Sequence, residues 1–127
     1  MDENEVSKVI VDSAIEVHRE FGGPGLLENI YEEALCRELE TRGLDVQRQF
    51  PVNVKYKGQE LGKKLVLDLL VEDKVIVEVK SVEKHNALYE AQLLTYLRTS
   101  HKSLGLLVNF GERYVVQGIR RVVNGLN

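Results

Sequence analysis

Hydrophobic and polar residues recur with a helical period in the first third of the chain. In residues 5–21, apolar side chains return every three or four positions and charged side chains take the opposite face. A second such stretch spans residues 27–42, between the breaker run 22–25 and Gly43, which is typical of a helix C-cap. Two amphipathic helices are therefore predicted. Their predicted buried positions are Val6, Ile10, Ala14, Val17 and Phe21, then Leu27, Ile30, Tyr31, Ala34, Leu35 and Leu39.

From residue 46 the period changes to the two-residue alternation of strands. Residues 46–56 alternate apolar and polar side chains, and Pro51 favours a place near a sheet edge. Two apolar runs, residues 65–71 and 75–81, are joined by Glu72-Asp73-Lys74, which predicts a hairpin. The later elements are a helix over residues 86–99 with Leu88, Ala91, Leu94 and Leu97 as its core face, a buried strand over 104–110, and a strand or turn over 114–123.

The predicted order is α-α-β-β-β-α-β-β. The helix between residues 75–81 and 104–110 is a crossover, which favours parallel pairing of these strands and a right-handed connection. We therefore expect an α/β fold with a mixed central sheet flanked by helices. The 127 residues, 43% of them hydrophobic, suit a single domain over residues 1–127 with one core.

The composition indicates the cellular compartment and the kind of partner that we expect for this protein. No apolar run is long enough to span a membrane, no signal peptide opens the chain, and the single Cys36 fits a reducing compartment, so we expect a cytoplasmic protein. Residues 1–45 carry 12 acids and 4 Lys or Arg, whereas residues 46–127 carry 8 acids and 13 Lys or Arg. The half that contains the hairpin is therefore basic, which permits a polyanionic partner.

The hairpin over residues 65–81 carries three ionisable side chains among apolar ones. Outside the loop, its odd-numbered positions are aliphatic up to residue 79, whereas Asp68, Glu78 and Lys80 share the even-numbered face with Val66, Leu70 and Ile76. Apolar residues on both faces predict a strand pair that is covered on both sides, where charges are costly.

A loop of three residues puts positions 68 and 78 directly opposite each other, with Cβ atoms roughly 4.5–5.5 Å apart. Two carboxylates at that distance repel unless a cation or a proton intervenes. Oxygen ligands of this kind suit Mg²⁺ or Mn²⁺, and Lys80 could reach a nearby water or phosphate oxygen. The alternative is a hairpin whose charges reach solvent at the sheet edge or pair as Lys80 with Glu78.

Two further groups of polar residues allow two interpretations each. Gln92 and Tyr96, four residues apart on the third helix, could hydrogen-bond a phosphate or simply pack at the surface. The cluster of lysines before the hairpin could protect a sheet edge or follow a phosphate backbone. Its members are Lys55, Lys57, Lys63 and Lys64.

Taken together, Asp68, Glu78-Val79-Lys80 and Gln92-x-x-x-Tyr96 resemble the PD-(D/E)xK nuclease superfamily, in its RecB-like branch, which has a restriction-endonuclease-like core. Gly25-x-x-Glu28-x-x-Tyr31, the surroundings of Asp68 and the ending GIRRVVN resemble the GxxExxY family of small bacterial and archaeal proteins. That resemblance covers roughly residues 6–124. Val66 departs from the family pattern, in which we expect an arginine or similar polar residue two positions before this Asp, and the departure concerns DNA affinity more than metal binding.

The resemblance implies roles for particular residues. Asp68 and Glu78 would ligate Mg²⁺ or Mn²⁺ with the Val79 carbonyl as a third protein ligand, and Lys80 would position or deprotonate the attacking water. Glu28 would match an acidic residue that the superfamily supplies from a helix ahead of the sheet, directly or through water at the metal. The remaining two residues, Gln92 and Tyr96, would support the site.

Three functions follow from this interpretation. The first is a metal-dependent nuclease that hydrolyses phosphodiester bonds in DNA. The second is a non-catalytic module that binds nucleic acid or a protein partner, and the third is hydrolysis of RNA or a nucleotide. The complete Asp-Glu-Lys set favours the enzyme, whereas the acidic first half and the small size favour a module. Chains of this size with a one-sided site often dimerise, so a homodimer is also an expectation.

Overall fold

The computed structural model describes residues 1–126, and its elements follow the predicted order. They are α1 (Glu3–Glu20), α2 (Glu28–Thr41), β1 (Val46–Tyr56), β2 (Gln59–Val71), β3 (Val75–Lys80), α3 (Ala87–Ser100), β4 (Leu104–Asn109), a 3₁₀ turn η1 (Val115–Gly118) and β5 (Ile119–Val123). The last predicted segment, a strand or turn, is thus a turn followed by a strand. No helix within residues 1–126 is long and apolar enough to cross a membrane.

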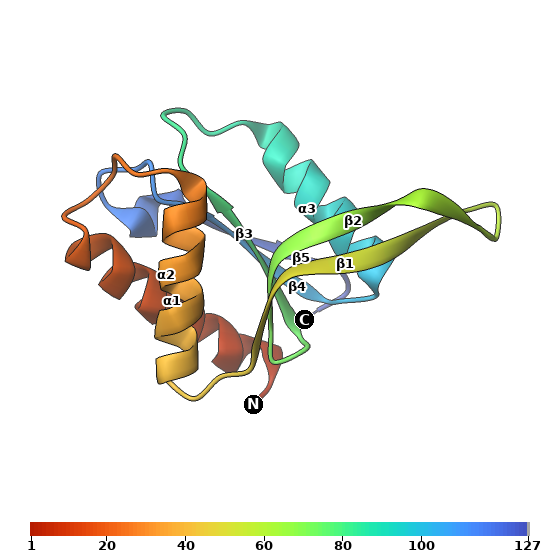
Figure 1. Cartoon of the computed structure of the whole chain (residues 1–127), viewed down its shortest axis with the longest axis horizontal. Coiled ribbons are helices and arrows are strands. Elements are labelled where there is room, and N and C mark those ends of the chain that lie inside the picture. Colours follow the sequence, from red (N-terminus) through yellow and green to blue (C-terminus); the bar gives the residue numbers. More distant parts are fainter. Residues whose placement is uncertain (127) are drawn as a thin grey trace.

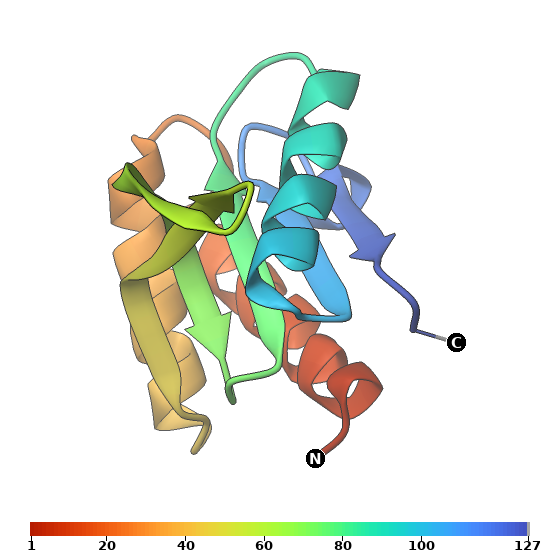
Figure 2. The ribbon, with the colours of Figure 1, turned by 90° about the vertical axis from the view of Figure 1, so that its right-hand side faces the viewer.

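The five strands form one mixed sheet in the order β1-β2-β3-β4-β5. Neighbouring strands are antiparallel except β3 and β4, which pair in parallel from Val75 with Leu104 to Lys80 with Asn109. Helix α3 makes the crossover between them. Helices α1 and α2 lie on one side of the sheet and α3 on the other (Figures 1 and 2). The α/β expectation is confirmed, and so are the parallel pair and the edge position of β1.

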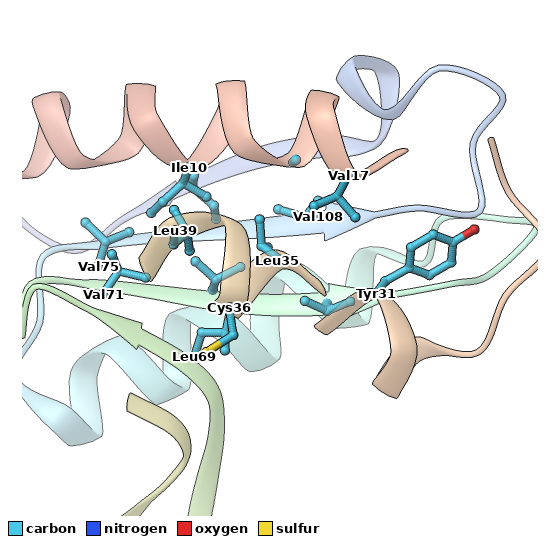
Figure 3. Packing of buried hydrophobic residues seen from close by; sticks show 14 of the residues in the cluster. Ile10, Val17, Tyr31, Leu35, Cys36, Leu39, Leu69, Val71, Val75 and Val108 are labelled. Atoms are coloured by element: carbon cyan, nitrogen blue, oxygen red, sulfur yellow. The ribbon is translucent and has the colours of Figure 1, made fainter. Parts of the chain in front are cut away.

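The larger core lies between the sheet and helices α1 and α2. Figure 3 shows Ile10, Leu35 and Leu39 from the helices packed against the sheet. Tyr31 anchors α2 in this core, because its ring stacks on Phe110 with centroids 4.5 Å apart and its hydroxyl donates a 2.7 Å hydrogen bond to the Gly23 carbonyl. The start of α2 is thereby fixed to the loop that precedes it.

Helix α2 is rotated relative to the predicted buried stripe. Leu27 is the N-cap and is 70% exposed, and Ile30 is 41% exposed, so these two predicted core positions are wrong. Phe21, which follows α1, is also exposed. The stripe instead follows Tyr31, Leu35 and Leu39 together with Glu32 and Cys36, and Leu27 lies outside the helix, which begins at residue 28.

The smaller core lies between the sheet and α3. It contains Leu67, Leu70, Ile76, Leu93, Leu97 and Leu107. The predicted core face of α3 is wrong at Leu88, which is 67% exposed, and at Ala91, which is exposed. Helix α3 carries apolar side chains around much of its circumference, so periodicity could not choose the face that meets the sheet. Contact with the sheet selects Leu93 and Leu97, four residues apart.

The ribbon formed by β1 and β2 bends beside the body of the protein. Leu67 packs on the α3 side whereas Leu69 packs on the α1–α2 side, so the predicted common face of the odd-numbered residues breaks between them. Gln49 adopts a left-handed backbone with φ of 53° between Arg48 and Phe50, which pair with Leu69 and Leu67. Beyond this bend the ribbon projects away from the helices (Figure 1). We call residues 53–64 the arm.

The segment that follows β3 is tied to the end of β4. Asn109 accepts hydrogen bonds from the backbone N–H groups of Val82 (3.0 Å) and Gly111 (2.9 Å), and donates one to the Val82 carbonyl (3.0 Å). A Cβ atom added at Gly111 would lie 2.2 Å from the Val82 carbonyl oxygen. Only glycine therefore lets these two backbones approach.

Gly111→Ala should destabilise the protein by about 1–3 kcal/mol, because the new methyl group forces the backbone at Val82 to move. Urea denaturation followed by circular dichroism measures the change. Gly62→Ala is the matched control, since no heavy atom lies within 4 Å of the added Cβ and its φ is not in the left-handed region. Equal stability of the two variants would show that the backbones are not in contact.

Candidate functional site

Asp68 and Glu78 come together across β2 and β3, as the hairpin predicted. The strands pair Leu69 with Val77 and Val71 with Val75, so the same register places residues 68 and 78 opposite each other. The three-residue turn is made possible by left-handed backbones at Glu72 (φ 55°) and Asp73 (φ 54°).

The two carboxylates bridge the strands at the point where backbone pairing stops. The Asp68 N–H donates to Glu78 Oε1 at 3.3 Å, and the Val79 N–H donates to Asp68 Oδ2 at 2.8 Å. Backbone pairing between these strands covers residues 69–71 and 75–77. Beyond it, each carboxylate takes a donor from the opposite strand. The acids are therefore held between the strands and do not point into bulk solvent.

Glu78 is strongly perturbed by this position. Glu78 is only 8% exposed. Its burial, and to a smaller extent the neighbouring Asp68, raise the pKa of Glu78 to about 9. The positive charge of Lys80 acts in the opposite direction. Near neutral pH the pair therefore holds a proton in place of a second negative charge, and a divalent cation would relieve the same repulsion.

Lys80 lies beside this pair on β3. Its Nζ is 4.7 Å from the centroid of the Tyr89 ring, and its charge acts on Glu78. Its backbone is fixed because the Lys80 carbonyl accepts a 2.8 Å hydrogen bond from Phe110 N–H. The ammonium group is thus held between α3 and the carboxylates.

Helix α3 brings Tyr96 to the same place. Burial raises the pKa of Tyr96, and the charges of Glu78 and Asp68 raise it further, so this half-buried side chain is within electrostatic reach of both acids. Gln92 lies one turn earlier on this flank of α3, between Tyr89 and Tyr96, and is exposed. Among residues 1–126 it makes no hydrogen bond through its side chain.

Among residues 1–126, no hydrogen bond or ion pair joins the predicted helical acid, Glu28, to this group. It is the first residue of α2 and is exposed, and it makes no ion pair within the described part of the chain. Its role stays a prediction.

Glu32, one turn after Glu28, was missed by the sequence reasoning although it is the acid that faces the sheet. Its side chain is 7% exposed and accepts hydrogen bonds from Arg48 Nε at 2.6 Å and from Gln49 Nε2 at 2.9 and 3.0 Å. Burial raises the pKa of Glu32, the two hydrogen bonds oppose this, and the charge of Asp68 adds to it. Glu32 and Asp68 are therefore neighbours. The available signal was its spacing of three and four residues from Leu35 and Cys36 on the buried stripe.

The donor set at the strand junction fits a hard divalent cation. Two carboxylates converge, and one of them cannot ionise near neutral pH without a compensating positive charge. The Val79 N–H points to Asp68, and in a strand the N–H and carbonyl of one residue point to the same neighbour, so the Val79 carbonyl is directed toward β2 as well. No cluster of three His, Cys, Asp or Glu side chains suited to a metal occurs in residues 1–126. Backbone and water oxygens would have to complete any coordination.

Comparisons with known proteins agree with this geometry. The family model described as the PD-(D/E)XK nuclease superfamily matches residues 4–122. The solved structure of SSO0001 has a similar fold, with a TM-score of 0.58 and 16% sequence identity over 78% of this chain and 50% of that chain. This chain thus spans about half the length of SSO0001. No curated protein is similar enough in sequence to count as a relative.

Glu78→Gln should stabilise the metal-free protein at pH 8 and change it little at pH 5. A carboxyl whose pKa rises on folding opposes folding wherever the unfolded chain is ionised, so stability should fall as the pH rises from about 4.5 toward 9. One pKa unit corresponds to about 1.4 kcal/mol and pH 8 lies about 3.5 units above the ordinary pKa of 4.5, so we expect a gain of up to about 5 kcal/mol at pH 8. Thermal unfolding in EDTA across this pH range measures the effect.

Glu83→Gln is the control for that experiment, because Glu83 is an exposed glutamate three residues after Lys80. It should leave the pH dependence of the melting temperature unchanged. A Glu78→Gln variant with the same pH dependence as the wild type would show that Glu78 ionises in the folded protein as it does in the unfolded chain.

Proposed function

The chain belongs to the PD-(D/E)XK nuclease superfamily, and on that premise we propose that it is a divalent-metal-dependent nuclease that hydrolyses phosphodiester bonds in DNA. The observation that carries the proposal is the pair of carboxylates between β2 and β3 with an ammonium group beside it. We further propose that the chain acts as one nuclease-like domain of the GxxExxY type. Its Gly25-x-x-Glu28-x-x-Tyr31 segment supports this finer placement.

In the proposed site, Asp68, Glu78 and the Val79 carbonyl would hold Mg²⁺ or Mn²⁺. The bound ion would polarise the phosphate, lower the pKa of a bound water and balance charge on the leaving oxygen. Glu78 would release its proton to solvent when the ion binds, so that Asp68 and Glu78 would both be ionised as ligands. The burial of this pair then keeps water from screening the interaction with the phosphate.

Lys80 positions the attacking water and stabilises the negative charge that develops on the phosphate. The Tyr89 ring under its ammonium group and the fixed backbone restrict where this charge can lie. We assign Tyr96 and Gln92 to orienting the phosphate from α3, since Tyr96 is already within electrostatic reach of both acids. Glu28 would act through water from the start of α2.

A second candidate is a non-catalytic module that uses the same fold to bind nucleic acid or a protein partner. It is favoured by one observation: both carboxylates already accept backbone N–H groups, so they have a structural role without any metal. The complete set of acids and lysine favours the enzyme over this alternative. Hydrolysis of RNA is a third possibility, and the same experiment tests it because RNA substrates are included.

Asp68→Asn and Lys80→Ala should each reduce cleavage of labelled DNA by roughly 10²-fold or more, since each removes a charge that stabilises the transition state. Single- and double-stranded DNA and RNA are incubated with the protein and Mg²⁺ or Mn²⁺, and initial rates are compared. Lys84→Ala is the matched control, because Lys84 is exposed and four residues after Lys80. Its rate should equal that of the wild type.

Cleavage that survives either Asp68→Asn or Lys80→Ala would contradict these roles. Binding of nucleic acid without cleavage in either metal would favour the module. A readout without activity is the melting temperature at pH 8, which Mn²⁺ should raise for the wild type but not for Asp68→Asn, because ligand binding to the folded state stabilises it.

A further inference from the structure

The arm, residues 53–64, is built differently from the rest of the sheet. Pairing of β2 with β3 begins only at Leu69, so β1 and β2 form a two-stranded ribbon beyond the bend. Every residue of the arm except the half-buried Val54 is exposed. Figure 1 shows this ribbon extending well past the helices. A two-stranded ribbon gains little stability by itself, so its length has no evident structural purpose.

The two faces of this ribbon differ in chemistry. Apolar side chains at its base, Phe50, Val52 and Leu67, pack in the smaller core with α3, and Val54 and Leu65 are half-buried. The alternating residues Pro51, Asn53, Lys55, Lys64 and Val66 are exposed. The arm itself contains four lysines and one acid, Glu60, although the chain as a whole has a net charge of −3. Positive charge is therefore concentrated on a projecting element of an acidic protein.

This charged ribbon leads to the candidate site along the chain, because strand β2 carries Lys63 and Lys64 of the arm as well as Asp68. A groove of about 600 Å³ between β1 and the end of α3 is lined by Leu67, which precedes Asp68, and by Thr99 and Ser100, which lie one turn after Tyr96. Lys55, Arg98 and Lys102 also line it. Asp68, Glu78, Lys80 and Tyr96 do not line this groove, so the connection between the arm and the two carboxylates is strand β2 itself.

We propose that the arm is the docking element for duplex DNA, with the ribbon in the major groove and its lysines on the phosphates. This inference rests on the proposed function and adds the surface and the form of the substrate. The major groove of B-DNA, about 12 Å wide, admits a two-stranded ribbon. The narrow major groove of an A-form RNA duplex does not. The shape of the arm thus selects duplex DNA among the nucleic acids that its charge would attract.

The spacing along β2 sets where the contacts fall. Lys64 is four residues from Asp68 and the turn at Gly58 is ten residues away, so at about 3.3 Å per residue the lysines lie roughly 13–33 Å from the carboxylates. At about 3.4 Å per nucleotide along one strand, this corresponds to phosphates roughly four to ten nucleotides from the cleaved bond. A duplex that ends within four base pairs of that bond would lose these contacts.

Two other occupants or uses of the arm predict different results. Lysines on exposed strand edges can simply prevent edge-to-edge aggregation. The arm could also bind the acidic helices of a second copy, since residues 1–45 carry 12 acids and 4 Lys or Arg. Salt-dependent DNA binding and the oligomeric state distinguish both uses from DNA docking.

The experiment measures the affinity of the full chain, in EDTA, for a fluorescent 30-base-pair DNA duplex over a series of salt concentrations. The test variant is Lys55→Ala/Lys57→Ala/Lys63→Ala/Lys64→Ala. The control, Lys8→Ala/Arg19→Ala/Arg37→Ala/Arg42→Ala, removes the same charge from exposed positions on or next to α1 and α2. The slope of log affinity against log salt should fall by about two to four units in the test variant, since each phosphate contact contributes about 0.9.

The control variant should keep the wild-type slope, and replacing the four lysines by arginine should restore it. Binding to an RNA duplex of the same sequence should be weaker and independent of the arm. The proposal is overturned if both quadruple variants lose affinity equally, if neither does, or if the RNA duplex depends on the arm as DNA does. Aggregation without a change in slope would show edge protection, and a wild-type dimer that the test variant dissociates would show a second copy as the occupant; either result also overturns it.

Cleavage assays on the same variants keep this inference separate from the proposed function. At sub-saturating duplex, the arm variant should cleave more slowly in proportion to its loss of affinity, whereas the control variant should cleave at the wild-type rate. A protein that cleaves DNA with an affinity independent of the arm would refute only the docking surface. Arm-dependent binding with no cleavage in Mg²⁺ or Mn²⁺ would refute only the nuclease.

Discussion

The opposition of Asp68 and Glu78 between β2 and β3 constrains much of the surrounding structure. Where backbone pairing between the two strands ends, their carboxylates accept the backbone N–H groups of the opposite strand. Each carboxylate therefore holds the sheet together and also lies close to the charge of the other. A buried pair of this kind is stable only with a proton or a cation. The raised pKa of Glu78 means that the pair retains a proton near neutral pH. A bound divalent ion would relieve the same repulsion. The position at which two charges repel is therefore also the position proposed for the chemistry.

The elements around the pair each supply one part of its environment. Strand β4, through Asn109 and the Phe110 N–H, fixes the backbone that carries Lys80. Helix α3 contributes the Tyr89 and Tyr96 rings on one side of the sheet, and α2 contributes Glu32 on the other. The site therefore draws on both cores, and a displacement of either helix layer would alter the electrostatics of the acids.

The bend at Gln49 links this site to the arm. Beside Asp68, the left-handed backbone of Gln49 interrupts the alternation of β1, and its side chain binds Glu32. Arg48 neutralises Glu32 from the neighbouring position. The ribbon is thus anchored at its base by polar contacts to Glu32 and by packing of Phe50 and Val52 in the smaller core, whereas the arm is exposed apart from Val54. A rigid base with a projecting charged end is an arrangement suited to guiding a long polyanion.

The sequence by itself determined the order of elements, the mixed sheet and the register of the hairpin, because a two-residue period and a three-residue loop leave one way to pair residues 68 and 78. It also determined that Asp68, Glu78 and Lys80 would be neighbours, since all three lie on adjoining strands. Only the tertiary structure decided which faces of α2 and α3 are buried. Several apolar stripes were available on each helix, so Glu32, Leu88 and Leu93 could be placed only by contact with the sheet. The break in alternation at Gln49, and with it the arm, likewise depends on long-range contacts that no local pattern encodes.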